Sequence, residues 1–149
     1  MRNLNFTLTL TALAAPAAAQ FALVAPPVCA TAEGTANNIF PWGRTTDQRY
    51  QQIFDSTTFS SQNITYPILI NNLRIRANAT TASWPGGTWP GPIDIKLSTS
   101  ANDYLAFSTT FANNQGPDLT TVYSGPVTKL AGVGAGTTTP APWFIDIAL

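Results

Sequence analysis

Acid–base chemistry in this chain would have to use aspartates, because histidine is absent and the single glutamate, Glu33, lies in a loose N-terminal segment. Asp94 and Asp146 have similar strand-like contexts, Pro-Ile-Asp-Ile and Phe-Ile-Asp-Ile. If these strands were neighbours, the two carboxylates could flank a glycosidic bond. The simpler interpretation is that both are outward-facing polar positions of alternating strands. The lack of histidine also excludes the common forms of Ser-His-Asp and Cys-His catalysis and the usual zinc sites.

Two tryptophans could bind sugar. Trp84 and Trp89 flank a Pro-Gly-Gly-Thr sequence, and a flat indole face with an N–H at its edge suits a pyranose ring. The alternative is that one or both indoles fold back over the sheet and pin a long loop. The pair therefore predicts a carbohydrate-binding site on residues 84–89, with packing as the competing explanation.

A second cluster offers oxygen ligands for a hard cation. Asn113, Asn114 and Asp118 surround Gly116 in a predicted turn, and calcium prefers ligands of this kind. The spacing does not match an EF-hand loop, and the cluster holds one carboxylate. The sequence thus leaves open a structural calcium or a plain turn stabilised by Asn and Asp side chains. It predicts no other cofactor.

The first nineteen residues predict a secretory signal peptide. Met1-Arg2 supplies a positive start, residues 8–15 are apolar, and three alanines before Gln20 form a small-residue cleavage site. The mature protein is therefore expected to start near Gln20 and to be secreted or held at the cell surface. No later stretch approaches the length of a membrane span.

The charge and the cysteine content of the chain limit the kinds of partner that it is expected to bind. The formal net charge is zero and charged residues make up 9% of the chain, so no polybasic surface for nucleic acid is expected. Polysaccharide and matrix components remain as partners. Cys29 is the single cysteine, which allows no intrachain disulfide; it either pairs with another chain or is a small, half-buried residue.

Period-2 alternation predicts a series of short strands, and no segment of helical length shows a sustained 3.6-residue period. Residues 20–38 are expected to be a loose leader or an edge strand, and residues 39–149 the folded domain. Prolines and glycines predict an irregular loop over residues 78–92. Arg74 and Arg76 are expected to face solvent and to pair with Asp55 or Asp94. Strands are predicted at residues 49–54, 68–77 (with a bulge at Asn71-Asn72), 93–98, 120–123 and 144–149.

These strands predict an antiparallel β-sandwich of jelly-roll or immunoglobulin-like type. The last strand stops without a turn, so the domain is expected to be incomplete at its C-terminus.

At residues 49–55 (Arg-Tyr-Gln-Gln-Ile-Phe-Asp) the chain resembles a group of secreted bacterial proteins, common in planctomycete-like genomes, with no assigned activity. The likeness continues through most of the chain after residue 36. The resemblance implies an exported β-sandwich, and it carries no catalytic residues. In the resembling proteins more of the domain follows, and some end in a Pro-Glu-Pro-type sorting tail. The shared elements are Phe-Pro-Trp (40–42), Pro-Ile-x-Ile (67–70), Ile-x-Ile-x-Leu-Ser-Thr (93–99), Thr-Phe-Ala-Asn-Asn-x-Gly-x-Asp (110–118) and Val-Tyr-Ser-Gly-Pro (122–126).

Together these features predict an exported, non-catalytic β-sandwich module of the cell surface or extracellular matrix. The alternative is a carbohydrate-binding module that uses Trp84 and Trp89. A hydrolase whose catalytic half follows Leu149 is the third hypothesis, and no residue of the sequence supports it.

Overall fold

The computed structural model describes residues 21–34, 42, 46–77, 81–134, 136 and 139–149. The predicted all-β, antiparallel class is confirmed, and the described helices are single short turns. The predicted signal peptide (residues 1–19) lies outside the described residues. No helix among the described residues has the length and apolar character needed to cross a membrane. The elements, in chain order, are η1 (Pro27–Ala30), α1 (Thr57–Ser60), β1 (Asn72–Arg76), β2 (Ser83–Trp84), β3 (Gly87–Leu97), η2 (Phe111–Asn114), β4 (Thr120–Lys129), β5 (Gly132–Val133) and β6 (Trp143–Ala148).

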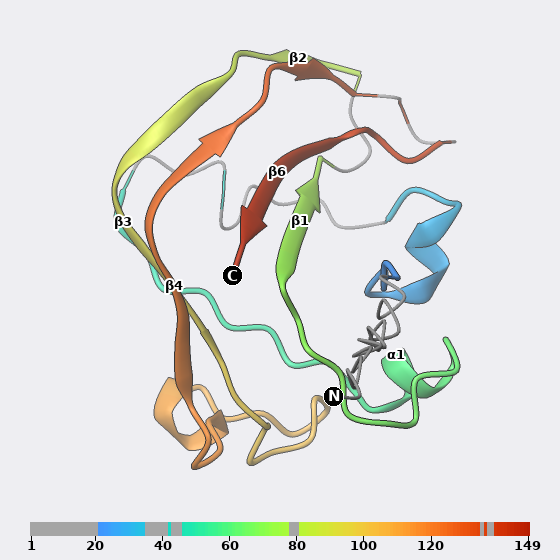
Figure 1. The fold of residues 1–149 in the computed structure, drawn as a ribbon, viewed down its shortest axis with the longest axis vertical. Helices are drawn as coiled ribbons and strands as arrows, with labels where there is room; N and C mark the ends of the chain where they lie inside the picture. The colour runs from blue at the N-terminus through green and yellow to red at the C-terminus, as the bar shows by residue number, and fades with distance from the viewer. Residues whose placement is uncertain (1–20, 35–41, 43–45, 78–80, 135, 137–138) are drawn as a thin grey trace, which may run out of the picture.

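The main sheet has four strands in the order β1-β6-β4-β3, and β2 and β5 form a separate two-stranded sheet, giving a sandwich-like arrangement (Figure 1). All strand pairs are antiparallel. Strands β3 and β4 form a long pair, and β1 and β6 form a second pair. Among the described residues, a single pair of positions, Lys129 and Ile145, joins β4 to β6. The two halves of the sheet therefore meet at one point and diverge below it, as Figure 1 shows.

Strand alternation places the core on one face of this sheet. Val127, Ile145 and Ile147 are at most 4% exposed and form the core cluster. Because side chains alternate along a strand, Asp146 points to the opposite, solvated face. Residues that pack around the cluster without full burial are Trp42, Ile75, Trp89, Ile93, Ile95, Tyr123, Phe144 and Leu149.

The prediction of an irregular loop over residues 78–92 is wrong for residues 83–84, which form β2, and for residues 87–92, which belong to β3. Strand β3 begins at Gly87 and continues through Pro90 and Pro92, with a register shift between Trp89 and Ile93. Proline has no N–H to donate and is tolerated in a sheet only at an edge or a bulge. Strand β3 is an edge strand and is bulged at this point, so both conditions are met.

The predicted strand at residues 49–54 is also absent from the sheets. Its alternation is nevertheless real, because Gln51 and Ile53 are half-buried while Gln52 and Phe54 are exposed. The segment is extended and held through side chains: Gln51 Nε2 donates to the carbonyl oxygen of Phe111 at 3.3 Å. The alternation thus indicated correctly which side of the segment is buried, but it did not mean that the segment pairs with another strand.

The N-terminal segment makes defined contacts over its described residues 21–34. The side chain of Gln62, after α1, accepts from Val24 N–H at 3.3 Å and donates to Val24 O at 3.0 Å. At the other end, Glu33 Oε1 accepts from the N–H of Ala141 at 2.6 Å. Instead of an edge strand, this part of the predicted leader contains η1, which includes the free, half-buried Cys29.

Candidate functional site

The two aspartates with similar sequence contexts do not come together. Asp94 on β3 accepts from Ser124 Oγ at 2.7 Å, and Asp146 on β6 lies two strands away across β4. Asp94 is level with Ser124, whereas Asp146 follows the residue that pairs with Lys129. Strand spacing and rise then separate the two carboxylates by roughly 16 Å, which is beyond the spacing used to cleave a glycosidic bond. They occupy the solvated sheet face, as the simpler interpretation predicted.

Asp146 is instead the partner of Arg74. Arg74 Nε lies 2.9 Å from Asp146 Oδ2, and Asn72 Nδ2 donates to the other carboxylate oxygen. The strand register opposes Arg74 and Asp146 directly on β1 and β6. The expected pairing of the arginines with Asp55 or Asp94 is therefore wrong for Arg74, because the neighbour of β1 in the sheet is β6.

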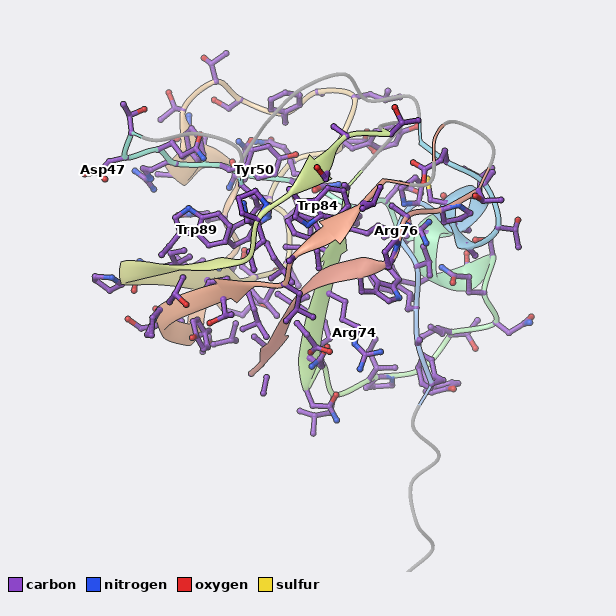
Figure 2. All side chains as sticks on the ribbon, turned by 90° about the horizontal axis from the view of Figure 1, so that it is seen from above. Asp47, Tyr50, Arg74, Arg76, Trp84 and Trp89 are labelled. Atoms are coloured by element: carbon purple, nitrogen blue, oxygen red, sulfur yellow. The ribbon has the colours of Figure 1, made fainter. Side chains whose placement is uncertain are left out.

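Arg76 does not share the position of Arg74, although one residue separates them on β1 (Figure 2). At the register shift between Ile75 and Arg76, Phe144 of β6 is left without a partner, so Arg76 comes opposite Trp143. The guanidinium carbon lies 4.9 Å from the ring centre of Trp143, and the buried Nη2 has no hydrogen-bond partner among the described residues. The expectation that both arginines face solvent fails at Arg76, because its guanidinium is half-buried against the ring of Trp143, its partner across the strands.

Trp84 is used for packing at the end of the sheet. Its indole N–H donates to Leu130 O at 3.0 Å, and its ring meets Phe144 edge-on at a centroid distance of 5.6 Å. Gly132 lies opposite it on β5, where a Cβ would approach the indole to 2.7 Å. Because the indole N–H already donates to a backbone carbonyl oxygen, it is not free to donate to a sugar hydroxyl.

Trp89 belongs to a different aromatic contact. Its ring lies 5.6 Å from that of Trp42, and Lys129 Nζ lies 5.5 Å from its centre. Trp84 on β2 and Trp89 on β3 thus each pack against their own partners (Figure 2). These contacts match the alternative in which the indoles pin the chain over the sheet. Sugar stacking by the pair stays a prediction.

Asn114, one of the three predicted calcium ligands, is a buried hydrogen-bonding centre with 2% exposure. Its Nδ2 donates to Gln51 Oε1 and to Ser108 O, both at 2.8 Å. Its Oδ1 accepts from Ser108 N–H at 2.7 Å and from Asn102 Nδ2 at 3.0 Å. These four bonds use the ordinary capacity of a primary amide, so the amide is committed to joining three segments of the chain.

Asp118 and Gly116, in the same region, both form hydrogen bonds with Thr99. Asp118 accepts from the N–H and the hydroxyl of Thr99 at 2.9 and 2.8 Å, and these two bonds lower the pKa of the carboxyl, the hydroxyl contributing more. Gly116 N–H donates to Thr99 O at 2.8 Å, and a Cβ on Gly116 would come within 2.2 Å of the Thr99 hydroxyl. We refer to residues 99–102 held against residues 108–118 as the clasp.

The side-chain oxygen atoms of Asn114 and Asp118 in the clasp accept hydrogen bonds from other residues of the chain. Asn113 is exposed and its Nδ2 lies 3.4 Å from Ser108 Oγ, while Asn114 and Asp118 are bonded as described above. Over the ranges that the structure describes, no group of three or more His, Cys, Asp or Glu residues gathers around a common point. Structural calcium therefore stays a prediction, and the geometry matches the alternative of a hydrogen-bonded turn.

Sequence reasoning missed a cleft of about 310 Å³ between residues 53–56 and residues 100–104. Phe54 and Tyr104, 44% and 46% exposed, are among its lining residues. Asp55 and Asp103 add carboxylates, each accepting a backbone N–H two residues ahead at 2.8 Å. The pKa of Asp55 is lowered by hydrogen bonds from the Thr57 hydroxyl and N–H, so this carboxylate stays ionised in mild acid. The sequence signal that could have indicated this cleft was the alternation of residues 49–54, which places the aromatic Phe54 on the exposed side of the segment.

Comparison with known proteins found no matching family model, no matching curated protein and no matching solved structure. The resemblance to secreted bacterial β-sandwich proteins accordingly stays a prediction. The interpretation of this molecule rests on its geometry: a polar, hydrogen-bonded sheet face, two aromatic contacts used for packing, a clasp, and one cleft with exposed rings and carboxylates.

Proposed function

We propose that the chain is an exported, non-catalytic β-sandwich module of the cell surface or extracellular matrix. The observation that carries this proposal is that the candidate catalytic carboxylates are separated and tied to structural partners. Asp94 is bonded to Ser124, and Asp146 to Arg74 and Asn72. General acid–base catalysis needs a carboxyl group that can reach a reacting proton in company with a second group. On this sheet face each carboxylate instead bridges to a neighbouring strand.

The chemistry of the solvated sheet face supports the same role. Across β3 and β4, Thr88 and Thr128 share a hydroxyl hydrogen bond of 3.1 Å. Cross-strand hydroxyl pairs of this kind stabilise an exposed sheet without using charge. The same face also carries the Arg74–Asp146 ion pair and the Asp94–Ser124 hydrogen bond. Its polar groups are thus used between strands, which supports a structural role.

An activity screen tests the proposal. The intact protein is assayed against panels of glycosides, esters and peptides, together with Asp94→Asn and Asp146→Asn variants. We expect no turnover above background for any of the three proteins. Specific turnover that disappears in either variant would overturn the non-catalytic role. Sequencing the N-terminus of exported protein tests the location, with Gln20 as the expected first residue.

A second candidate function, binding of a neutral carbohydrate, is favoured by the cleft between residues 53–56 and residues 100–104. Exposed rings at Phe54 and Tyr104 offer stacking surfaces. Asp55 and Asp103 offer oxygen atoms that accept hydrogen bonds from sugar hydroxyls. The lining contains no basic residue, so a neutral glycan fits it better than an anionic one.

Glycan-array and insoluble-polysaccharide binding separate this candidate from the tryptophan site. Binding that is lost in Phe54→Ala/Tyr104→Ala and kept in Trp84→Ala/Trp89→Ala places the sugar in the cleft. Binding that is kept in Phe54→Ala/Tyr104→Ala and lost in Trp84→Ala/Trp89→Ala would place the sugar at the predicted tryptophan pair. Absence of binding to every glycan tested would remove carbohydrate recognition and leave the structural role.

A further inference from the structure

The cleft that contains Phe54 and Tyr104 carries an aromatic ring and a carboxylate on each of its two walls. Phe54 is followed by Asp55 on one wall, and Tyr104 is preceded by Asp103 on the other. The two rings are 44% and 46% exposed, and no Lys or Arg lines the cleft. Aromatic faces and carboxylates both attract positive charge. The lining therefore has the chemistry of a site for a cationic group.

Within the part of the chain that the structure describes, neither carboxylate of the cleft is balanced by a cationic side chain. The single ion pair in those residues joins Arg74 to Asp146 on the sheet. Hydrogen bonds from the Thr57 hydroxyl and N–H lower the pKa of Asp55 and keep this carboxyl ionised in mild acid. A cation that enters the cleft therefore meets uncompensated negative charge.

The two walls of the cleft are tied together by the buried amide of Asn114. Its Nδ2 donates to Gln51 Oε1 at 2.8 Å, just before the first wall, and its Oδ1 accepts from Asn102 Nδ2 at 3.0 Å, within the second. A cleft with walls that are already ordered loses less conformational entropy on binding. Its volume of about 310 Å³ lies at the lower end of the range for ligand pockets, about 300–1,000 Å³, which suits one ring-sized group.

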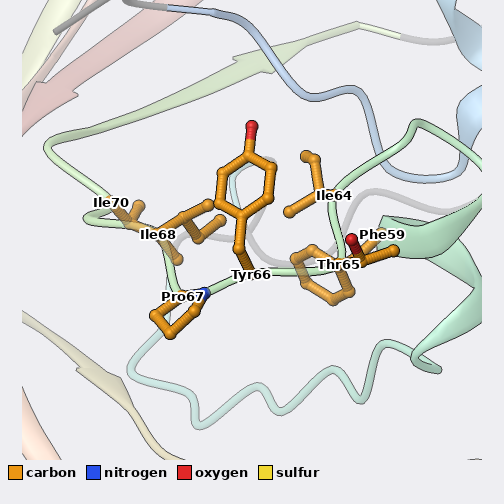
Figure 3. Close-up of a pocket in the computed structure, with 7 residues that line it drawn as sticks. All are labelled: Phe59, Ile64, Thr65, Tyr66, Pro67, Ile68 and Ile70. Carbon is orange, nitrogen blue, oxygen red and sulfur yellow. The ribbon is translucent and has the colours of Figure 1, made fainter.

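A larger hollow, of about 470 Å³ beside residues 64–70, has different chemistry. It is lined by Phe59, Ile64, Thr65, Tyr66, Pro67, Ile68 and Ile70, as Figure 3 shows. None of these side chains carries a charge, and Ile64 is 8% exposed. The hollow offers no group that would select a cation, so charge selection is a property of the cleft alone among the two.

We propose that the cleft binds a glycan residue that carries a free amino group, with the ammonium group between the two rings and facing the carboxylates of Asp55 and Asp103. This inference rests on the second candidate function and names the class of sugar that the cleft takes. The pyranose ring stacks on an aromatic face. The ammonium group adds cation–π attraction and charge-assisted hydrogen bonds to the carboxylates. Acetylation of the amine removes the charge, so the cleft should distinguish an amino sugar from its acetylated form.

A sugar fits the cleft better than the ammonium group of a lysine side chain. The exposed Ser56 adds a hydroxyl group to the lining, and a hydroxyl can both donate to and accept from the hydroxyls of a sugar. A lysine side chain brings no hydroxyl and would leave this group unused. The combination of ring faces, a hydroxyl and carboxylates is therefore matched by an amino sugar as a whole.

Two tetrasaccharides that differ only in acetylation of their amino groups test the inference. They are the β-1,4-linked tetramer of glucosamine and its fully N-acetylated counterpart. Each is titrated calorimetrically into the full-length protein, at a pH at which the free amines are charged. We expect wild type to bind the amino form at least about tenfold more tightly, from the added cation–π and carboxylate contacts.

Matched variants locate the charge preference. Asp55→Asn/Asp103→Asn should bind the two tetramers with similar affinity, and asparagine keeps the carbonyl oxygen that accepts each backbone N–H. Asp94→Asn, on the sheet face, is the control and should keep the tenfold preference. Phe54→Ala/Tyr104→Ala should weaken binding of the amino form, whereas Tyr66→Ala, which removes a 57% exposed ring outside the cleft, should not.

The outcomes separate this inference from the neutral-glycan candidate. Tighter binding of the acetylated tetramer, or equal binding of both forms by wild type, would overturn the preference for an amine and leave the neutral-glycan candidate standing. Binding of neither tetramer would overturn the inference, and the glycan array decides the neutral-glycan candidate separately. Trilysine is the third titrant: if it bound as tightly as the amino tetramer, the cleft would be a site for basic peptides and the assignment to a sugar would be wrong.

Discussion

The clasp and the apolar segment, which is residues 66–70 (Tyr-Pro-Ile-Leu-Ile) directly before β1, both have little regular secondary structure and are held in opposite ways. In the clasp, one buried amide, that of Asn114, makes four hydrogen bonds to three segments of the chain. In the apolar segment, Leu69 is 90% exposed and no described backbone partner is present. The difference teaches that a loop can be held by satisfied polar atoms within the chain, whereas the apolar segment lies extended without such bonds among the described residues.

The largest effect in this comparison is expected at Asn114. Asn114→Ala removes four hydrogen bonds and leaves half-buried polar groups of Ser108 and Gln51 unpaired, which should lower the free energy of unfolding by about 3 kcal/mol. Asn113→Ala, at the exposed neighbour, should change it by less than about 0.5 kcal/mol. Urea denaturation measures both. Equal effects at the two positions would show that the clasp is not centred on Asn114.

Gly116→Ala should come next. Its Cβ would lie 2.2 Å from the Thr99 hydroxyl and 2.8 Å from the Thr99 carbonyl oxygen, so the backbone of the clasp must move. We expect a loss of about 2 kcal/mol, within the range for overpacking. Gly91→Ala is the control, because no heavy atom lies within 4 Å of its added Cβ. Thermal unfolding of the two variants separates close approach from a general effect of replacing glycine.

The clasp also predicts a dependence on pH. Hydrogen bonds from the Thr99 hydroxyl and N–H lower the pKa of Asp118 below the usual value of an aspartate carboxyl. The resulting stabilisation is present above that value and is lost as the pH falls through the lower, folded-state pKa. Acid unfolding of Asp118→Asn should lack this component, and Thr99→Val should reduce it because the N–H bond remains. Identical acid profiles for wild type and Asp118→Asn would contradict the assignment.

The smallest effect on folding is expected in the apolar segment. Leu69→Thr should change the free energy of unfolding by less than about 0.5 kcal/mol, because the side chain is 90% exposed and loses little burial. Urea denaturation measures the difference. A large loss would mean that Leu69 is buried within the chain, which would contradict the contrast with the clasp.

The strands with regular alternation could be predicted from sequence. Residues 93–98 and 144–149 correspond to the second half of β3 and to β6, because their apolar positions face one core. Strand β3 was predicted too short, since proline was taken to end it and the edge position was unknown. Asn114 could not be recognised as a structural centre, because its partner Gln51 lies 63 residues earlier in the chain.

The two arginines of β1 show the same limit. Alternation predicts the same solvent exposure for Arg74 and Arg76, but their partners on β6 differ: Arg74 lies opposite Asp146 and Arg76 opposite Trp143. The partner that each arginine meets depends on β6, and the sequence of β1 alone does not contain that information. The cleft between residues 53–56 and residues 100–104 was missed for a related reason, because its two walls meet only in the folded chain.

The prolines of β3 limit how far such a sheet can grow. Pro90 and Pro92 interrupt the donors along the outer edge, and the bulge between Trp89 and Ile93 twists it. An incoming chain therefore meets no continuous row of hydrogen-bonding groups over residues 87–92, which disfavours edge-to-edge pairing along that half of β3.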